Sequence, residues 1–318
     1  MTNLFNFKGI DRVTYGVEDM VAGVKFFDDW GLRRISTENH GVLYQTVDGT
    51  EVYLRPIDEP ELPPPFEGGS TTREIVWGLE SEEDLNSLCK SLSDEGSLRD
   101  IDGRPACTDP NGLTISFRVT QRRDVSLSGT LINTFAKPNA RVDRQSAFYD
   151  RAEPIEVGHV VFFVSDLGAT ESFYMNKLGF VMSDRYPGSG AFLRCKVEGG
   201  HHNLFLLQTD ERHRGLNHVA FTVRDIHEVF GGGLYIDRCG WKTQIGPGRH
   251  PISSAYFWYV ENPCGGLVEY FTDEDYLTKA WQPRDFDRTS ENYAEWGIGG
   301  GIDGHTRRQK PDVIDSAI

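Results

Sequence analysis

The sequence predicts an α+β fold of two domains, each built from two βαβββ modules. Three observations predict it. The length of 318 residues suits about two domains of roughly 150 residues. The two halves of the chain resemble each other, and a weaker repeat lies inside each half. Each repeating unit reads as a strand, a helix and then short strands separated by Gly and Pro turns. The expected units span residues 7–57, 70–120, 155–209 and 214–273.

The repeat between the halves is visible in two pairs of segments. Residues 13–20 (VTYGVEDM) resemble residues 160–167 (VVFFVSDL), and a Gly-Leu or Gly-Phe pair follows each of them. Residues 109–113 (DPNGL) resemble residues 262–267 (NPCGGL). Self-similarity at this distance predicts a duplicated domain.

The repeat inside each half joins an apolar strand pattern to a helical pattern. In the first half, residues 75–79 (IVWGL) precede residues 81–88 (SEEDLNSL), where Ser81 and Asp84 form an N-terminal capping arrangement. In the second half, residues 217–223 (NHVAFTV) precede residues 225–230 (DIHEVF). The boundaries that follow are a first domain, a connector, a second domain and a C-terminal tail at residues 1–121, 122–154, 155–275 and 276–318.

Composition restricts the class of partner. The formal charge of −15 at pH 7 disfavours nucleic acid and anionic membranes, because such a surface repels phosphate. No apolar run is long enough for a transmembrane helix, and the first residues lack the pattern of a secretory signal. The 5 Cys are scattered and never spaced as C-x-x-C, which is typical of reduced thiols. We therefore expect a cytoplasmic protein.

Two histidines and one glutamate are the strongest candidates for a site. His159 and His218 open equivalent predicted strands, and Glu269 interrupts the apolar run GLVEYF at residues 266–271. A charged glutamate there costs several kcal/mol without a partner. Two imidazoles and one carboxylate are the facial ligand set of non-haem Fe(II) oxygenases. Two strand-end histidines and a salt-bridged glutamate are the alternative, and spacing alone supports both equally.

These residues carry a family resemblance. Residues 158–160 (GHV), 217–221 (NHVAF) and 267–271 (LVEYF) resemble the three ligand motifs of vicinal oxygen chelate proteins. Over residues 7–275 the chain resembles the two-domain type I extradiol dioxygenases, which include the dihydroxybiphenyl and catechol 2,3-dioxygenases. The resemblance implies a vicinal oxygen chelate, or glyoxalase-like, fold. It also implies a metal held by His159, His218 and Glu269, with Fe(II) expected and Mn(II) as the alternative.

The resemblance implies catalytic roles for three further residues. His202 matches the acid–base histidine of the family, while His250 and Tyr259 match residues that hydrogen-bond the bound catecholate. His201 competes with His202, and adjacent strand residues point to opposite faces, so only one of them can reach the metal. The expected substrate-binding residues are Val161, Phe192 and Ile252, although Phe192 and Ile252 could equally be plain core.

The first half departs from the ligand pattern. Aligning the repeats places Arg12, Glu74 and Ile115 where the second half has His159, His218 and Glu269. Because arginine and isoleucine cannot bind iron, the first domain is expected to be a metal-free scaffold.

The function that the resemblance implies is Fe(II)-dependent extradiol cleavage of a substituted catechol, or a related polyhydroxylated aromatic, with insertion of both atoms of O2. Such an enzyme belongs to the catabolism of aromatic hydrocarbons, and a homo-oligomer is expected. The alternatives are a glyoxalase-type isomerase or transferase and a metal-free module that binds an aromatic compound. The tail is predicted to be a lid, an oligomer contact or a poorly ordered terminus.

Overall fold

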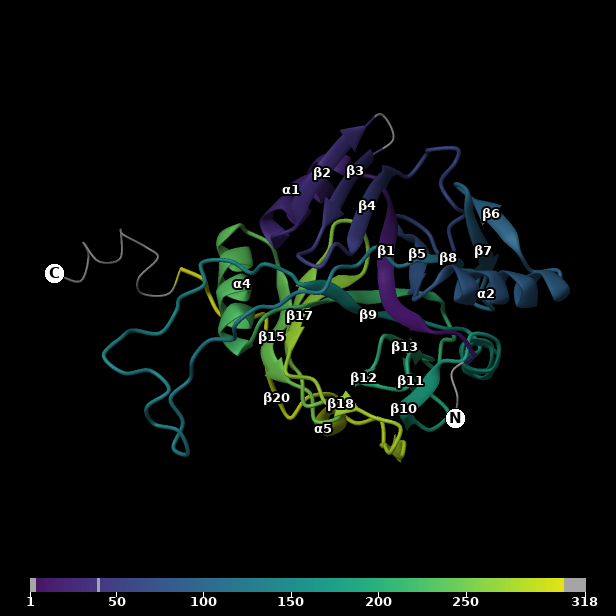
Figure 1. The fold of residues 1–318 in the computed structure, drawn as a ribbon. Coiled ribbons are helices and arrows are strands. Elements are labelled where there is room, and N and C mark those ends of the chain that lie inside the picture. The colour runs from purple at the N-terminus through teal and green to yellow at the C-terminus, as the bar shows by residue number, and fades with distance from the viewer. Residues whose placement is uncertain (1–3, 39–40, 306–318) are drawn as a thin grey trace.

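The computed structural model describes residues 4–38 and 41–305, and it confirms the α+β fold class. The first eight strands form one sheet, in the order β2-β3-β4-β1-β5-β8-β7-β6. Its elements are β1 (Phe7–Val17), α1 (Met20–Trp30), β2 (Arg33–Glu38), β3 (Gly41–Gln45), β4 (Glu51–Pro56), β5 (Thr71–Leu79), α2 (Glu82–Asp94), β6 (Arg99–Ile101), β7 (Arg104–Thr108) and β8 (Thr114–Val119). This sheet lies in the upper part of Figure 1.

A second sheet of ten strands has the order β19-β10-β11-β13-β9-β14-β17-β16-β15-β20. Its two modules contain β9 (Glu156–Phe163), α3 (Leu167–Ser172), the π-helical turn η1 (Phe173–Lys177), β10 (Val181–Tyr186), β11 (Gly190–Arg194), β12 (Gly199–Gly200), β13 (Leu204–Leu207), β14 (Gly215–Thr222), α4 (Ile226–Arg238), β15 (Thr243–Arg249), β16 (Tyr256–Glu261) and β17 (Leu267–Thr272). Short strand β12 pairs separately with β18 (Tyr276–Leu277).

The two sheets repeat one topology. In each sheet the first strands of the two modules pair antiparallel at the centre, as β1 with β5 and β9 with β14. Each of these central strands also pairs in parallel with the last strand of its own module, as in β9 with β13 and β14 with β17. Equivalent positions of the two modules therefore meet at the centre of each sheet. The candidate ligands lie at the centre of the second sheet, on β9, β14 and β17.

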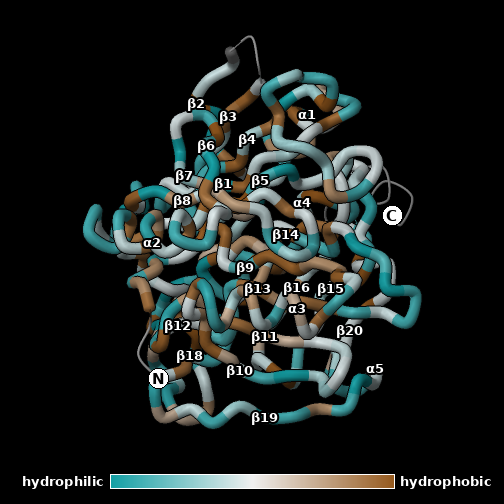
Figure 2. Tube along the Cα trace, turned by 90° about the vertical axis from the view of Figure 1, so that its right-hand side faces the viewer, coloured by the Kyte–Doolittle hydropathy of each residue, from teal (hydrophilic) through white to brown (hydrophobic). Residues whose placement is uncertain are grey.

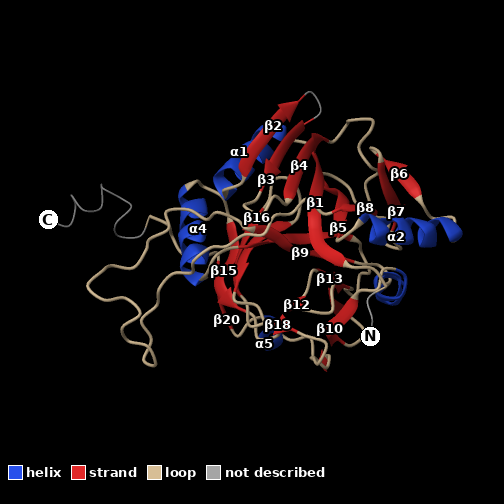
Figure 3. Cartoon of the chain, viewed as in Figure 1, coloured by secondary structure: helices blue, strands red, loops and turns tan. Residues whose placement is uncertain are grey.

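Local sequence explains where the helices begin. The side chains of Ser81, Asp166 and Asp225 accept hydrogen bonds from backbone N–H groups in the first turns of α2, α3 and α4. Helix α1 ends at Gly31, whose φ of 100° is a left-handed conformation that favours glycine. The helices lie on the outer sides of the sheets (Figure 3).

One hydrophobic core joins the two sheets. Trp30 of α1 stacks on Tyr270 of β17 with 3.6 Å between ring centroids, and the Tyr270 hydroxyl donates to the Trp30 carbonyl at 2.6 Å. Asn111 of the first half likewise donates to the carbonyl of Phe163 at 2.9 Å. The strands are predominantly hydrophobic and the outer loops hydrophilic (Figure 2). This packing fixes the first sheet firmly against the second.

The connector and the C-terminal tail lie outside the modules, and only the tail pairs with a sheet. Residues 121–155 carry no helix or strand, and much of this segment leaves the body as a long loop (Figure 1). The tail folds back on the second sheet through β19 (Arg284–Asp285), α5 (Ser290–Tyr293) and β20 (Trp296–Gly299). The prediction for the tail concerned residues 276–318, of which residues 306–318 lie outside the described part. Among the described residues, no helix is long and apolar enough to cross a membrane.

Candidate metal centre

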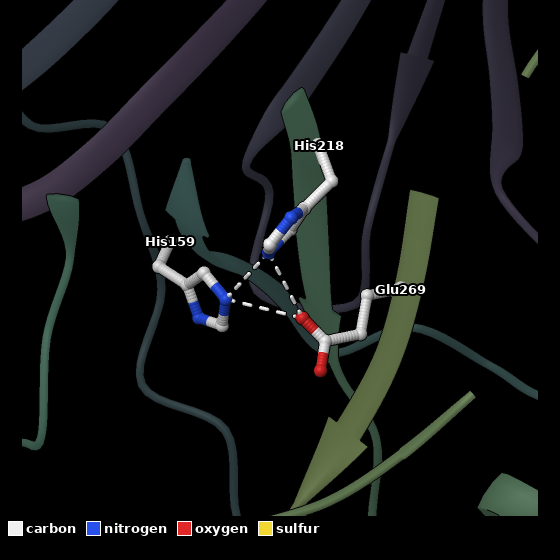
Figure 4. Close-up of side chains that lie close together, drawn as sticks. All are labelled: His159, His218 and Glu269. Atoms are coloured by element: carbon white, nitrogen blue, oxygen red, sulfur yellow. Dashed lines mark hydrogen bonds and ion pairs between the residues drawn. The ribbon is translucent and has the colours of Figure 1, made fainter. Parts of the chain in front are cut away.

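Three strands of the second sheet bring His159, His218 and Glu269 together (Figure 4). Nε2 of His159 lies 3.2 Å from Nε2 of His218 and 3.1 Å from Oε2 of Glu269. Nε2 of His218 lies 3.2 Å from the same carboxylate oxygen. All three residues are buried, and Glu269 is only 1% exposed. Residues separated by up to 110 positions thus converge on one point.

This triangle of atoms fits a bound cation better than it fits hydrogen bonding. A neutral imidazole has one N–H, so these three contacts cannot all be hydrogen bonds. Adjacent ligands of an octahedral metal at about 2.2 Å lie about 3.1 Å apart, which is the separation seen here. Two nitrogens and one carboxylate oxygen could therefore hold such an ion from one side, with His159, His218 and Glu269 as its protein ligands.

The protonation states suit metal binding. Burial lowers the pKa of His159 to about 4, so this imidazole is neutral near pH 7. Burial acts to raise the pKa of Glu269, but the neighbouring His159, His218 and His250 lower it well below its usual range. Nδ1 of His218 lies 2.6 Å from Oδ1 of Asn217. Because this amide oxygen can only accept, His218 carries its proton on Nδ1 and its Nε2 keeps a lone pair.

The adjacent histidines His201 and His202 have different surroundings. They follow β12 in a bend, so the expected alternation of strand faces does not apply. Instead Nδ1 of one ring lies 3.1 Å from Nδ1 of the other. His202 lines the cavity, and its ring lies beside that of His159 with 4.1 Å between ring centroids and 36° between the ring planes. His201 is 0% exposed and its Nε2 lies 2.9 Å from Oδ2 of Asp184.

His250 and Tyr259 lie beside two other members of the triangle, Glu269 and His218. Nε2 of His250 lies 3.0 Å from the Tyr259 hydroxyl and 3.8 Å from Oε1 of Glu269. Nδ1 of His250 donates to the backbone carbonyl of Tyr293 at 2.6 Å, which leaves Nε2 to accept from the tyrosine when the histidine is neutral. Burial, and then the charge of Glu269, raise the pKa of Tyr259 well above its usual value. Tyr259 is thus a hydrogen-bond donor across the neutral pH range.

A cavity of about 570 Å³ opens onto these residues. Val161 and Phe192, two of the predicted substrate-binding residues, line it together with the apolar side chains of Phe163, Phe205, Leu207, Leu267 and Phe271. Ile252 does not line it. This residue lies in the turn after β15 and packs in a small buried cluster with Tyr186 and Phe192.

Several residues of the cavity carried no signal in the sequence. The tail contributes Arg288, Thr289, Ser290 and Tyr293 to the wall, although its sequence has no strong periodicity. Glu274 also lines the wall and accepts a hydrogen bond from the backbone N–H of His201 at 2.8 Å. Asn217 could have been found, because it directly precedes a candidate ligand. Asp184, which contacts His201 from β10, could not.

The corresponding face of the first sheet is built from ion pairs. The strand register places Arg12 at the position of His159 and Glu74 at that of His218. The third position is Ser116, since β5 pairs with β8 as Glu74↔Thr114 while β14 pairs with β17 as His218↔Leu267. The expectation that Ile115 stands there is therefore wrong by one residue. Ile115 instead faces the core and is 0% exposed.

Comparison with known proteins gives this geometry a context. Residues 156–270 match the model of the Glyoxalase/Bleomycin resistance protein/Dioxygenase superfamily. The chain is 34% identical over 191 residues to metapyrocatechase 2 of Cupriavidus necator, which is 59% of this chain and 59% of that relative. It is 25% identical over 291 residues to the 3-methylcatechol 2,3-dioxygenase of Pseudomonas putida. This match covers 84% of this chain and 94% of that relative.

Solved structures share the fold along most of the chain. The Mn(II)-bound glyoxalase from Novosphingobium aromaticivorans superposes with a TM-score of 0.73 at 22% identity, covering 93% of both chains. The 2,2',3-trihydroxybiphenyl 1,2-dioxygenase from Sphingomonas wittichii gives 0.68 at 18% identity, with 92% and 99% covered. These matches confirm the vicinal oxygen chelate fold. Residues 156–270 thus match the Glyoxalase/Bleomycin resistance protein/Dioxygenase superfamily model, and the chain is similar in sequence and fold to extradiol dioxygenases.

Proposed function

We propose that this protein is an extradiol dioxygenase that cleaves the ring of a substituted catechol with O2. The observation that carries the proposal is the convergence of His159, His218 and Glu269 on one wall of a cavity. In this proposal residues 155–275 form the catalytic domain and residues 1–121 a metal-free scaffold.

The proposed ligands are His159, His218 and Glu269, and the proposed metal is Fe(II), with Mn(II) as the alternative. When bound, such an ion would accept the two adjacent catechol oxygens and O2 on its open face and provide the redox chemistry of ring cleavage. A single carboxylate among the ligands leaves a net positive charge, which favours binding of the catechol as an anion.

His202 is the proposed acid–base residue. It lines the cavity beside His159, within reach of a hydroxyl group bound at the open face. Burial and the neighbouring His159 and His201 lower its pKa well below the usual value, so the ring is neutral and can accept a proton.

His250 and Tyr259 are proposed to hydrogen-bond the bound catecholate. They lie beside His218 and Glu269 of the ligand triangle, and the Tyr259 hydroxyl remains protonated at neutral pH. A bound catecholate oxygen would take the place of His250 Nε2 as the acceptor of this hydroxyl. Donors preorganised in a buried site stabilise negative charge more strongly than water does.

The cavity favours a catechol that carries a substituent. Its volume of about 570 Å³ lies within the roughly 300–1,000 Å³ of pockets that hold drug-sized ligands. Its apolar walls at Val161 and Phe192 suit an aromatic ring and exclude water.

The test is anaerobic reconstitution with Fe(II), followed by oxygen uptake and absorbance of the ring-opened product across a panel of 3- and 4-substituted catechols. We expect one O2 consumed for each product formed. Stoichiometric iron without oxygen uptake on any catechol would overturn the proposal. Turnover of a glutathione hemithioacetal would point to the glyoxalase alternative, and aromatic binding without metal to the binding module. Size-exclusion chromatography with light scattering tests the expected homo-oligomer.

A further inference from the structure

A chain of three buried side chains leads away from the cavity behind His202. Its members are His202, His201 and Asp184, and it ends at Arg284 of the tail strand β19. The ring nitrogens Nδ1 of His202 and His201 are 3.1 Å apart, and Nε2 of His201 lies 2.9 Å from Oδ2 of Asp184. Asp184 and His201 are both 0% exposed, so water does not compete for these contacts.

Arg284 fixes the end of this chain. Its Nη2 donates to Oδ2 of Asp184 at 2.6 Å, and its backbone N–H donates to Oδ1 at 2.7 Å. Asp184 is therefore an ionised carboxylate already paired with one cation. This pairing occurs where β19 joins β10, through the register Asp184↔Arg284.

The hydrogen-bonding capacity of each group determines where the protons lie. An ionised carboxylate can only accept, so Nε2 of His201 carries a proton and donates to Asp184. If His201 were also protonated on Nδ1, its fully buried imidazolium would have to share the Asp184 carboxylate with Arg284, which already pairs with it, and an incompletely paired buried charge is costly. Burial also lowers the pKa of His201. His201 is thus neutral, and its bare Nδ1 must accept from Nδ1–H of His202.

We propose that Asp184 and His201 are positioning residues that hold His202 in the tautomer with its proton on Nδ1 and its bare Nε2 towards the cavity. The same contacts fix the orientation of the ring. Arg284 sustains the arrangement by keeping Asp184 charged and in place. The docked tail therefore helps to fix the tautomer and the ring orientation of His202. The proposal deepens the proposed function, because it makes His202 a base before any substrate arrives.

The direct test is ¹⁵N NMR of the metal-free protein labelled at histidine. The signals of His202 are assigned by comparison with the spectrum of a His202→Gln variant. We expect a protonated Nδ1 and an unprotonated Nε2 for His202. A protonated Nε2 on His202, or rapid exchange between the two tautomers, would overturn the proposal. This measurement needs neither metal nor activity, so its outcome is independent of whether catechols are cleaved.

A matched pair of variants tests the consequence for turnover. In His201→Gln the side-chain amide can replace the Nε2–H donor to Asp184 but offers nothing at the Nδ1 position. In His201→Asn the amide oxygen can replace the Nδ1 acceptor for His202 but loses Asp184. Because the acceptor sets the tautomer, we expect His201→Gln to lower kcat about 10- to 100-fold, as loss of a supporting hydrogen bond does, with unchanged KM and bound metal. His201→Asn should retain most of kcat.

Controls separate positioning from a general loss of structure. Asp166→Asn changes an Asp that caps α3 in the same domain and should leave kcat unaltered, since Asn caps a helix equally well. Equal loss of kcat in the Gln and Asn variants, or loss of bound metal in either, would contradict the positioning role. If either variant fails to fold, the NMR measurement on the wild-type protein still decides.

Discussion

The two sheets share one topology, yet the equivalent faces at their centres are chemically opposite. In the first sheet Glu74 is 1% exposed and accepts hydrogen bonds from Arg104 at 3.0 Å and from Thr14 at 3.1 Å. Ser116 donates to the same carboxylate. In the second sheet the carboxylate of Glu269 lies against the imidazole rings of His159, His218 and His250, and no guanidinium pairs with it among the described residues.

The two faces differ in whether their carboxylates are paired with guanidinium groups. In the first sheet Arg12 and Arg118 both contact Glu51, at 2.7 and 3.0 Å, and they lower its pKa although burial acts to raise it. Every carboxylate of this group has a guanidinium partner, so a metal would gain nothing there. The comparison teaches that two sheets of one topology can present different side chains at equivalent positions, ion pairs in the first and the His-His-Glu triangle in the second.

Loss of the second-sheet carboxylate should have the largest effect. Glu269→Gln removes the only negative ligand, so we expect bound metal to disappear and kcat/KM to fall at least about a thousandfold, because the metal supplies several kcal/mol. Ser116→Ala changes the equivalent position of the first sheet and should change neither quantity. The measurement is metal content by mass spectrometry together with oxygen uptake. Equal metal content in the two variants would contradict the claim that Glu269 binds the metal and that the equivalent position of the first sheet does not.

Removal of the proposed base should have the next largest effect. His202→Ala leaves all three ligands in place, so we expect unchanged metal content and a kcat about 10² to 10³-fold lower. His201→Ala should lower kcat less, since its ring does not line the cavity. Normal turnover in His202→Ala, combined with an inactive His201→Ala, would show that the base was assigned to the wrong histidine.

Removal of the tyrosine hydroxyl should have a smaller effect. Tyr259→Phe deletes one donor while His250 remains, so we expect kcat to fall about tenfold to a hundredfold with metal content unchanged. Steady-state kinetics on the best catechol of the panel measures it. A rise in KM alone would mean that Tyr259 contributes to binding and not to the reaction.

The smallest effect concerns stability, and it has opposite signs in the two halves. Burial raises the pKa of Glu274 to about 8, so between about pH 4.5 and 8 the folded chain holds one proton that the unfolded chain releases. This group therefore makes the free energy of unfolding fall with rising pH, by about 1.4 kcal/mol per unit. Glu51, whose pKa is lowered, contributes stability that is present above its unfolded pKa and lost as pH falls through its folded pKa.

Urea denaturation at pH 5.5 and 7.5 measures this difference. Glu274→Gln should flatten the decline of stability over that interval, whereas Glu51→Gln should leave the decline unchanged and lower stability at both pH values. An identical pH dependence in wild type and Glu274→Gln would show that this carboxyl group is ionised in the folded protein.

Local patterns predicted the modules, because strand and helix periodicity and cap residues act over a few positions. Ser81 and Asp84 at the start of α2 are one example. The ligand triad was implied by the family resemblance, since its members lie too far apart in the sequence for any local motif. The mistaken Ile115 arose because residues 109–113 and 262–267 differ by one residue in length, and only the hydrogen-bond register shows which strand positions correspond.

Other features depend on contacts between distant segments and leave no local trace. Ile252 points into a cluster with Phe192 because of the turn that carries it. Asp184 and Arg284 meet across 100 positions, and neither sits in a motif. The tail reaches the cavity through Tyr293 and Arg288 without the periodicity that would have predicted it.

The most direct test of the account is anomalous diffraction from crystals loaded anaerobically with Fe(II). We predict one iron peak per chain, at bonding distance from Nε2 of His159, Nε2 of His218 and Oε2 of Glu269, and no peak beside Arg12, Glu74 and Ser116. A peak at another position, or none at the His-His-Glu triangle under saturating iron, would contradict the claim that one sheet holds the metal while its duplicate supports it.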